Sequence, residues 1–152
     1  SSYMKRFLKT VLAVSVIAFS VGITSSAIYV PPYPEYLNED SSYPLVYGHM
    51  GVGEYVDLGS IYIIRQDDSG IEFKVSVVYY NYDKDTISTS VSHFFKRYSD
   101  PNSLYYSACR KEKYSPEEWH QGDLSNTSGY MQSANKTFLT CMEQITGEPY
   151  RY

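Results

Sequence analysis

The chain has 152 residues, with 13 Lys and Arg against 17 Asp and Glu, a net charge of −4 and 16% aromatic residues. This length suits a single domain. The excess of acidic residues argues against a nucleic-acid partner, because nucleic acids attract surfaces rich in Lys and Arg. It argues against binding to an anionic membrane surface for the same reason.

The first 27 residues have the layout of a secretory signal peptide. Met4 begins a short basic segment, and the three residues before it are interpreted as lying upstream of the translation start. Residues 11–23 are almost entirely apolar or small, but they are fewer than the ~20 that a membrane-spanning helix needs. Ser25 and Ala27 are the small residues that signal peptidase requires, so we predict cleavage after Ala27. The alternative is an uncleaved segment that stays as a membrane anchor.

Cleavage would leave an acidic, exported protein. The segment contains three of the basic residues and no acidic residue, so the mature part would carry a net charge of −7. We therefore expect the protein in the periplasm, on the cell surface or outside the cell, with no stable membrane span after cleavage.

Two cysteines, Cys109 and Cys141, lie in the mature part. In an oxidising compartment an isolated pair predicts a disulfide bond. The alternatives are a buried pair of free thiols, or a cysteine nucleophile with a nearby histidine. The second alternative needs an activated thiolate, and no residue close in sequence to either cysteine indicates one.

Residues 28–44 form a leader rich in proline and tyrosine. Proline restricts φ and lacks an N–H donor, so the segment is expected to be extended and similar to polyproline II. It either tethers the domain or lies across it. We expect a single globular domain over residues 45–152.

Several segments that follow the leader have the composition of β-strands. Residues 71–82 alternate, with Ile71, Phe73 and Val75 on one face, which is the pattern of a half-buried strand. The turn at 67–70 would join this strand to residues 61–65 in a hairpin. The other predicted strands are 45–47, 54–58, 87–98 and 104–110. Together they predict an antiparallel meander of about five or six strands.

The C-terminal part of the chain changes to helical periodicity. Residues 115–119 have the pattern of a short helical turn, and residues 121–129 are polar and loop-like. Residues 134–146 are predicted to be a helix, with Ser133 at its start and Gly147 at its end. Its apolar stripe consists of Phe138, Cys141, Met142 and Ile145. We therefore predict an α+β fold in which this helix packs on one face of the antiparallel sheet.

No pattern of catalytic or metal-binding residues stands out. His49, His93 and His120 have no metal-ligand spacing, neither cysteine belongs to a C-x-x-C motif, and a G-x-S-x-G motif is absent from the sequence. We predict no catalytic residues, no metal, no cofactor and no enzymatic activity. A small secreted hydrolase built around His93 and nearby acidic residues is the catalytic alternative.

Tyrosine is the most unusual feature of the composition, because 17 of the 18 tyrosines lie after residue 27. Tyrosine is favoured at half-buried strand positions, and we expect most of these residues to have that structural role. It also provides rigid contact area at binding surfaces. A Tyr-rich face is therefore the predicted site for a host-surface or cell-wall component, although no individual binding residue can be identified.

The segment Tyr55-Val56-Asp57-Leu58-Gly59-Ser60-Ile61, followed by a hairpin and by Val77-Val78-Tyr79-Tyr80, resembles small secreted bacterial proteins of the surface-adhesin protein E-like group. The resemblance covers about residues 45–146. It implies an envelope location and a binding, adhesin-like role without catalysis. A periplasmic structural or inhibitory protein is the main alternative to this function.

Overall fold

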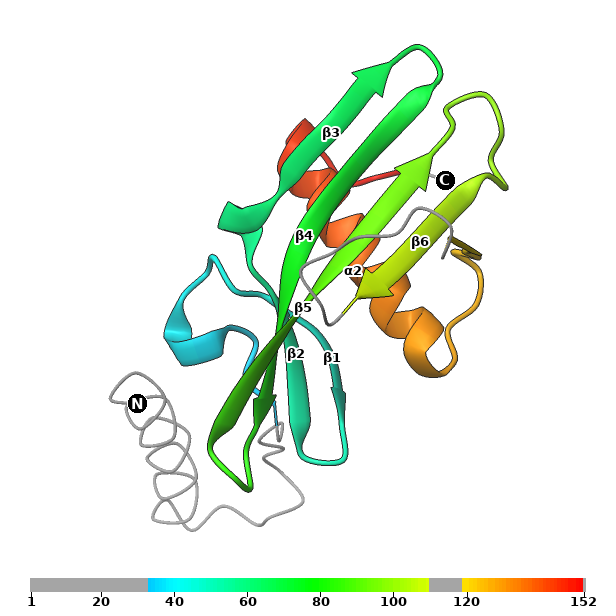
Figure 1. Cartoon of the computed structure of the whole chain (residues 1–152). Helices are drawn as coiled ribbons and strands as arrows, with labels where there is room; N and C mark the ends of the chain where they lie inside the picture. The colour runs from blue at the N-terminus through cyan, green and yellow to red at the C-terminus, as the bar shows by residue number, and fades with distance from the viewer. Residues whose placement is uncertain (1–32, 110–118, 152) are drawn as a thin grey trace, which may run out of the picture.

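The computed structural model describes residues 33–109 and 119–151. Within them, an antiparallel β-sheet of seven strands carries the C-terminal helix α2 (Gly129–Thr146) on one face (Figure 1). The strands are β1 (Leu45–His49), β2 (Val52–Val56), β3 (Tyr62–Asp67), β4 (Gly70–Asn81), β5 (Thr86–Lys96), β6 (Leu104–Cys109) and β7 (His120–Gln121). This arrangement confirms the α+β fold. The predicted signal peptide with its cleavage site at Ala27, and residues 115–118 of the predicted turn, lie outside the described residues.

Strand β4 is the central strand of the sheet. It pairs with β5 along its whole length, from Ile71↔Lys96 to Asn81↔Thr86. Its other edge is shared, because β3 pairs with its first half and β2 with its second half (Figure 1). The predicted hairpin of β3 and β4 is therefore present. The sheet order is β1-β2-β4-β5-β6-β7, and β3 lies beside β4, so the strands do not all follow one another as in a simple meander.

The short 3-10 turn η2 (Leu58–Ser60) fills the gap between β2 and β3 on this edge. The carboxylate of Asp57 accepts a hydrogen bond from Gly59 N at 3.1 Å, which begins the turn. In the gap, Ser76 N donates to Ser60 Oγ at 2.7 Å, and Ser76 O accepts from Asp57 N at 3.0 Å. The turn thus satisfies the backbone of β4 where neither neighbouring strand reaches it.

The main core lies between α2 and one face of the sheet, which we call the helix face. Phe73 and Phe94 on this face stack at 5.4 Å between ring centroids. The ring centroid of Phe138 of α2 lies 6.1 Å from that of Phe73 and 5.8 Å from that of Phe94. Cys141 and Met142 are buried beside Phe138. The predicted apolar stripe of the helix is confirmed, and so is the predicted alternation in the first half of β4. In its second half β4 is buried on both faces, because Val78 and Tyr80 are buried on the opposite side of the sheet.

Helix α2 begins at Gly129, which is earlier than the predicted start near Ala134. Its first turns are polar and contain glycine, so the periodicity of the sequence did not reveal them. They are held by tertiary contacts, because Met131 and Ala134 pack against the core and Asn135 Nδ2 donates to Asp123 O and Asn126 O of the preceding loop at 2.8 Å. The predicted C-terminus is confirmed, since Gly147 has φ 79° and donates to Glu143 O at 2.8 Å.

Residues 33–44 of the leader pack against the opposite face of the sheet, which we call the leader face. Leu37 is only 1% exposed and packs with Tyr55, Val78 and Tyr80 of a second core cluster. Tyr33 Oη accepts a hydrogen bond from Gly51 N at 2.9 Å. The described part of the leader therefore lies across the domain rather than only tethering it. It is not extended throughout, as was expected, because Leu37–Glu39 form the 3-10 turn η1. Among the described helices, α2 included, none is both long and apolar enough to cross a membrane.

Candidate functional site

A groove of about 420 Å³ lies between the helix face and the first half of α2. The space exists because small residues face one another across it, with Ser92 and Ala108 on the sheet and Gly129 and Ala134 on the helix. The other described residues that line it are Tyr47, His49, Glu54, Val77, Tyr79, Phe94, Tyr106, Ser133 and Thr137. Five strands and one helix thus contribute to a single concave site.

Tyrosines from three strands form the walls of the groove. Tyr47 of β1 stacks with His49 at 6.2 Å between ring centroids, and Tyr106 of β6 lies 5.7 Å from His120. Tyr79 of β4 is half-buried, and its hydroxyl accepts a hydrogen bond from Ser90 Oγ at 3.2 Å. These contacts orient the rings, so the groove has preformed aromatic walls.

Glu54 is the one acidic or basic side chain, histidine apart, among the described residues that line the groove. It is half-buried and accepts a hydrogen bond from Ser133 Oγ of α2 at 2.8 Å. Burial raises the pKa of Glu54 above its usual value, and the hydrogen bond from Ser133 partly opposes this shift. The groove therefore places one oriented carboxyl group among aromatic walls.

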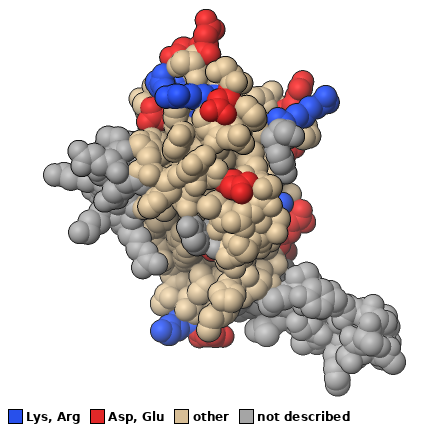
Figure 2. All heavy atoms as spheres, turned by 90° about the vertical axis from the view of Figure 1, so that its right-hand side faces the viewer, with Lys and Arg blue, Asp and Glu red and all other residues tan. Residues whose placement is uncertain are grey.

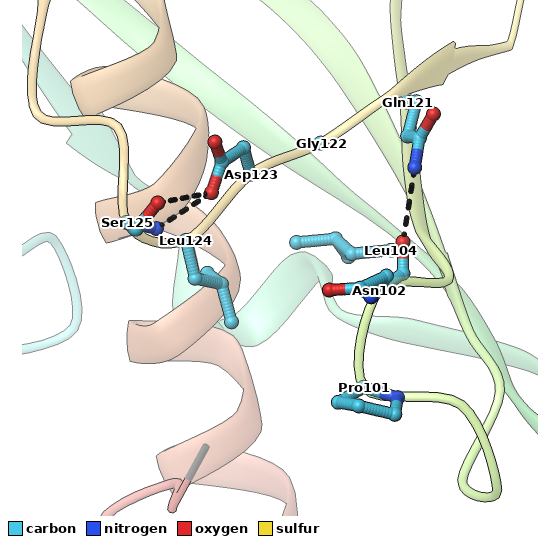
Figure 3. Close-up of a pocket in the computed structure, with 8 residues that line it drawn as sticks. All are labelled: Pro101, Asn102, Leu104, Gln121, Gly122, Asp123, Leu124 and Ser125. Carbon is cyan, nitrogen blue, oxygen red and sulfur yellow. Dashed lines mark hydrogen bonds between the residues drawn. The ribbon is translucent and has the colours of Figure 1, made fainter.

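A second, larger hollow of about 750 Å³ lies among the loops that follow β5 and β7 (Figure 3). Its polar side chains bond to the surrounding loops: Asp123 accepts from Ser125 N of its own loop at 2.9 Å, and Gln121 Nε2 of β7 donates to Asn102 O of the loop after β5 at 3.3 Å. Leu104 and Leu124 extend into the same space (Figure 3) and belong to the edge of the main core. We interpret this hollow as structural, because its polar groups organise turns rather than face a ligand.

His93, the residue of the predicted catalytic alternative, does not line the groove. It is 2% exposed and pairs in register with Lys74 and Ser107, while the groove residue Phe94 points to the other face of the sheet. The ring centroid of Trp119 lies 6.5 Å from that of His93. Burial, with a smaller effect from the charge of Lys74, lowers the pKa of His93 to about 4. His93 is therefore neutral at pH 7 and out of reach of anything bound in the groove.

The other two histidines differ in position. His49 is exposed and lines the groove, whereas His120 is exposed on β7, as expected for it. The described part of the chain brings no three His, Cys, Asp or Glu residues together in a group that could hold a metal ion.

Cys141 is a free, buried thiol in the structure, so the predicted disulfide with Cys109 is not formed there. Cys109 ends β6, and its side chain lies outside the described residues. Burial raises the pKa of Cys141 to about 12. This is the opposite of what an activated nucleophile requires.

Many of the remaining tyrosines form a structural cluster on the leader face. Tyr55 and Tyr80 are fully buried, and Tyr80 Oη donates to Asp85 Oδ1 at 2.6 Å. The hydroxyls of Tyr55 and Tyr82 are hydrogen-bonded to each other, and Tyr55 Oη also bonds Pro34 O at 3.0 Å. Burial raises the pKa of Tyr80 and of Tyr82. The tyrosine excess therefore has a structural part on this face and a groove-lining part on the helix face.

Sequence reasoning did not identify the groove residues individually. The signal that could have found them lies in β4, where the residues of the helix face change from Phe73 and Val75 to Tyr79 and Asn81. This change from aliphatic and phenyl side chains to polar ones marks the end of the part of the sheet that the helix covers.

No protein-family model, no curated protein and no solved structure matches this chain. The resemblance to the surface-adhesin group accordingly stays a prediction.

Proposed function

We propose that this chain is an exported envelope or surface protein that binds a ligand in the groove between the sheet and α2, without catalysing a reaction. The observation that carries the proposal is the groove itself, with walls of Tyr47, Tyr79 and Tyr106 around the half-buried Glu54. Concave sites with aromatic walls and a few placed polar groups are typical of ligand binding.

The positions of the nucleophile and base candidates support binding over hydrolysis. His93 is buried on the other side of the sheet from the groove, and the pKa of Cys141 is raised. Neither residue can assist a reaction at Glu54 or Tyr79. The export and the envelope location rest on the predicted signal peptide and on the resemblance.

The charge of the groove lining also supports recognition by contact rather than by long-range attraction. Figure 2 shows charged side chains at both ends and along one edge of this view of the molecule, and an acidic group near its middle. Among the described residues that line the groove, Glu54 is the one acidic or basic side chain, histidine apart, so a ligand would be selected by shape, aromatic contact and hydrogen bonding.

The test is protein-detected NMR with defined compounds of four classes: neutral oligosaccharides, sulfated oligosaccharides, short peptides and fatty acids. At least one class is expected to shift the resonances of Glu54, Tyr79 and Ser92. The variant Ala108→Trp fills the groove with a large side chain and should abolish these shifts. A matched control, Gln66→Trp on the exposed strand β3, should retain them. A groove that responds to none of the four classes would refute the proposal.

A further inference from the structure

The helix face continues beyond the groove as an open polar surface, and the following inference about its ligand rests on the proposed function. Two rows of side chains cross four strands in register. The first row is Tyr47, Glu54, Tyr79 and Ser88, and the second is His49, Val52, Asn81 and Thr86. We call these eight residues the platform.

The platform and the groove are continuous. A shallow hollow of about 290 Å³ lies over the platform and is lined by Val52, Tyr79, Asn81, Thr86, Ser88, Thr89 and Ser90. Tyr79 lines both this hollow and the groove. A ligand that starts in the groove beside α2 can thus extend across the platform without leaving the protein surface.

Apart from Glu54 and His49, the side chains of the platform are uncharged, and several of them carry hydroxyl groups. Ser88 and Thr86 provide hydroxyl donors and acceptors, and Tyr79 provides an aromatic surface beside them. Asn81 adds an uncharged amide, although its Oδ1 already accepts hydrogen bonds from Asp83 N and Lys84 N of the following turn. Among the described residues that line the groove and the hollow, no Lys or Arg is found, and Glu54 carries the acidic group. An anionic ligand would meet a carboxylate with no compensating positive charge.

We infer that the groove and platform bind an extended, uncharged polysaccharide chain that runs across the strands. Pyranose rings have apolar C–H faces that pack on aromatic rings, and a rim of hydroxyls that matches hydroxyl and amide side chains. Adjacent strands lie ~4.8 Å apart, so the platform is roughly 14 Å wide from β1 to β5 and has room for several sugar units. Strand pairing makes the surface a continuous sheet, which suits an extended chain better than a coiled one.

The backbone pairing argues against a peptide added as a further strand on this surface. The platform residues of β1, β2, β4 and β5 pair with one another in the sheet, so their main-chain groups on the shared edges are already used. The contacts available on the platform come from side chains, as saccharide recognition requires.

The experiment is isothermal titration calorimetry of the full mature chain with cellohexaose and chitohexaose, and with a heparin hexasaccharide as the sulfated comparison. At least one neutral hexasaccharide is expected to bind, and heparin is expected not to bind. Tyr79→Ala should weaken binding at least about tenfold, because it removes the ring shared by groove and platform. Tyr79→Phe keeps the ring and should retain most of the affinity, which covers the case in which the alanine variant is poorly folded.

Tyr62→Ala is the matched control, because Tyr62 is a 60% exposed tyrosine on β3, away from the platform. It should leave binding unchanged. Absence of binding by both neutral hexasaccharides, equal binding of heparin, or an equal loss in Tyr62→Ala would each overturn the inference. If peptides or fatty acids shift the groove resonances while both sugars do not, the inference fails and the proposed binding function stands.

Discussion

At the scale of single residues, two features of the surroundings of Glu54 shift its pKa in opposite directions. Its partial burial disfavours the carboxylate, while the hydroxyl of Ser133 stabilises it from 2.8 Å. The net effect is a raised pKa, so the folded protein holds this proton more tightly than the unfolded chain does.

Glu54→Gln should therefore change the pH dependence of stability. A raised pKa in the folded state means that the contribution of Glu54 is full below the unfolded pKa and is lost as the pH rises through the folded value. Glutamine does not ionise, so the variant does not lose this contribution as the pH rises. At pH 7 it should be at least as stable as the wild type, and the free energies of unfolding of the two proteins should become similar near pH 4. Urea midpoints at both pH values measure this, with Glu143→Gln on the exposed side of α2 as control. A lower midpoint for Glu54→Gln at pH 7 would contradict it.

His93 should produce the opposite dependence. Its pKa is lowered to about 4 in the folded protein, so the unfolded chain binds an additional proton between about pH 6.5 and 4. The contribution of neutral His93 to the free energy of unfolding is therefore fully present above pH 6.5, and it decreases as the pH falls through this window. His93→Gln should reduce the wild-type loss between pH 7 and 4 by up to about 3 kcal/mol. Chemical denaturation across this range measures it, and the exposed His120→Gln should behave like the wild type.

At the scale of elements, α2 is held by its apolar stripe more than by its own propensity. Phe138 is fully buried and contacts the rings of Phe73, Phe94 and Tyr150. Phe138→Ala should cost about 3–5 kcal/mol of unfolding free energy, because it leaves a cavity between three rings. Lys136→Ala, on the exposed side of the same helix, should stay within about 0.5 kcal/mol of the wild type. Equal effects of the two substitutions would contradict the packing of Phe138 against the sheet.

The leader gives a second prediction at this scale. Leu37 is almost completely buried against Tyr55 and Tyr80. Leu37→Ala should destabilise the domain by about 2–5 kcal/mol, while the exposed Ser41→Ala should be nearly neutral. Urea denaturation separates the two results. A leader that only tethers the domain would make Leu37→Ala neutral as well.

At the scale of the whole molecule, the core of the helix face isolates Cys141 from solvent. Its pKa is raised to about 12 and it is completely buried. In a Cys109→Ser variant, the thiol of Cys141 should react with a thiol reagent at pH 8 only as fast as the protein unfolds. Rapid labelling of the folded variant would show that Cys141 is not buried between α2 and the sheet.

Much of the fold could be predicted because its signals are local. The alternation of Ile71, Phe73 and Val75, the turn at 67–70 and the glycine that ends α2 all depend on neighbouring residues. The start of α2 at Gly129 and the short strand β7 could not be predicted in this way. Both are stabilised by partners distant in sequence, such as the pairing of His120 with Tyr106.

The sequence by itself determined the class of fold, the face of β4 that packs against the helix and the acidic character of the chain. Periodicity and charge are properties of the order of residues, so they need no knowledge of the fold. Only the tertiary structure decided that β2 and β3 share one edge of β4, and that residues 33–44 pack against part of the leader face. It also brought Tyr47, Glu54, Tyr79 and Tyr106 from four strands into one groove. Such a site depends on strand register and on the placement of α2, which arise from contacts between distant segments.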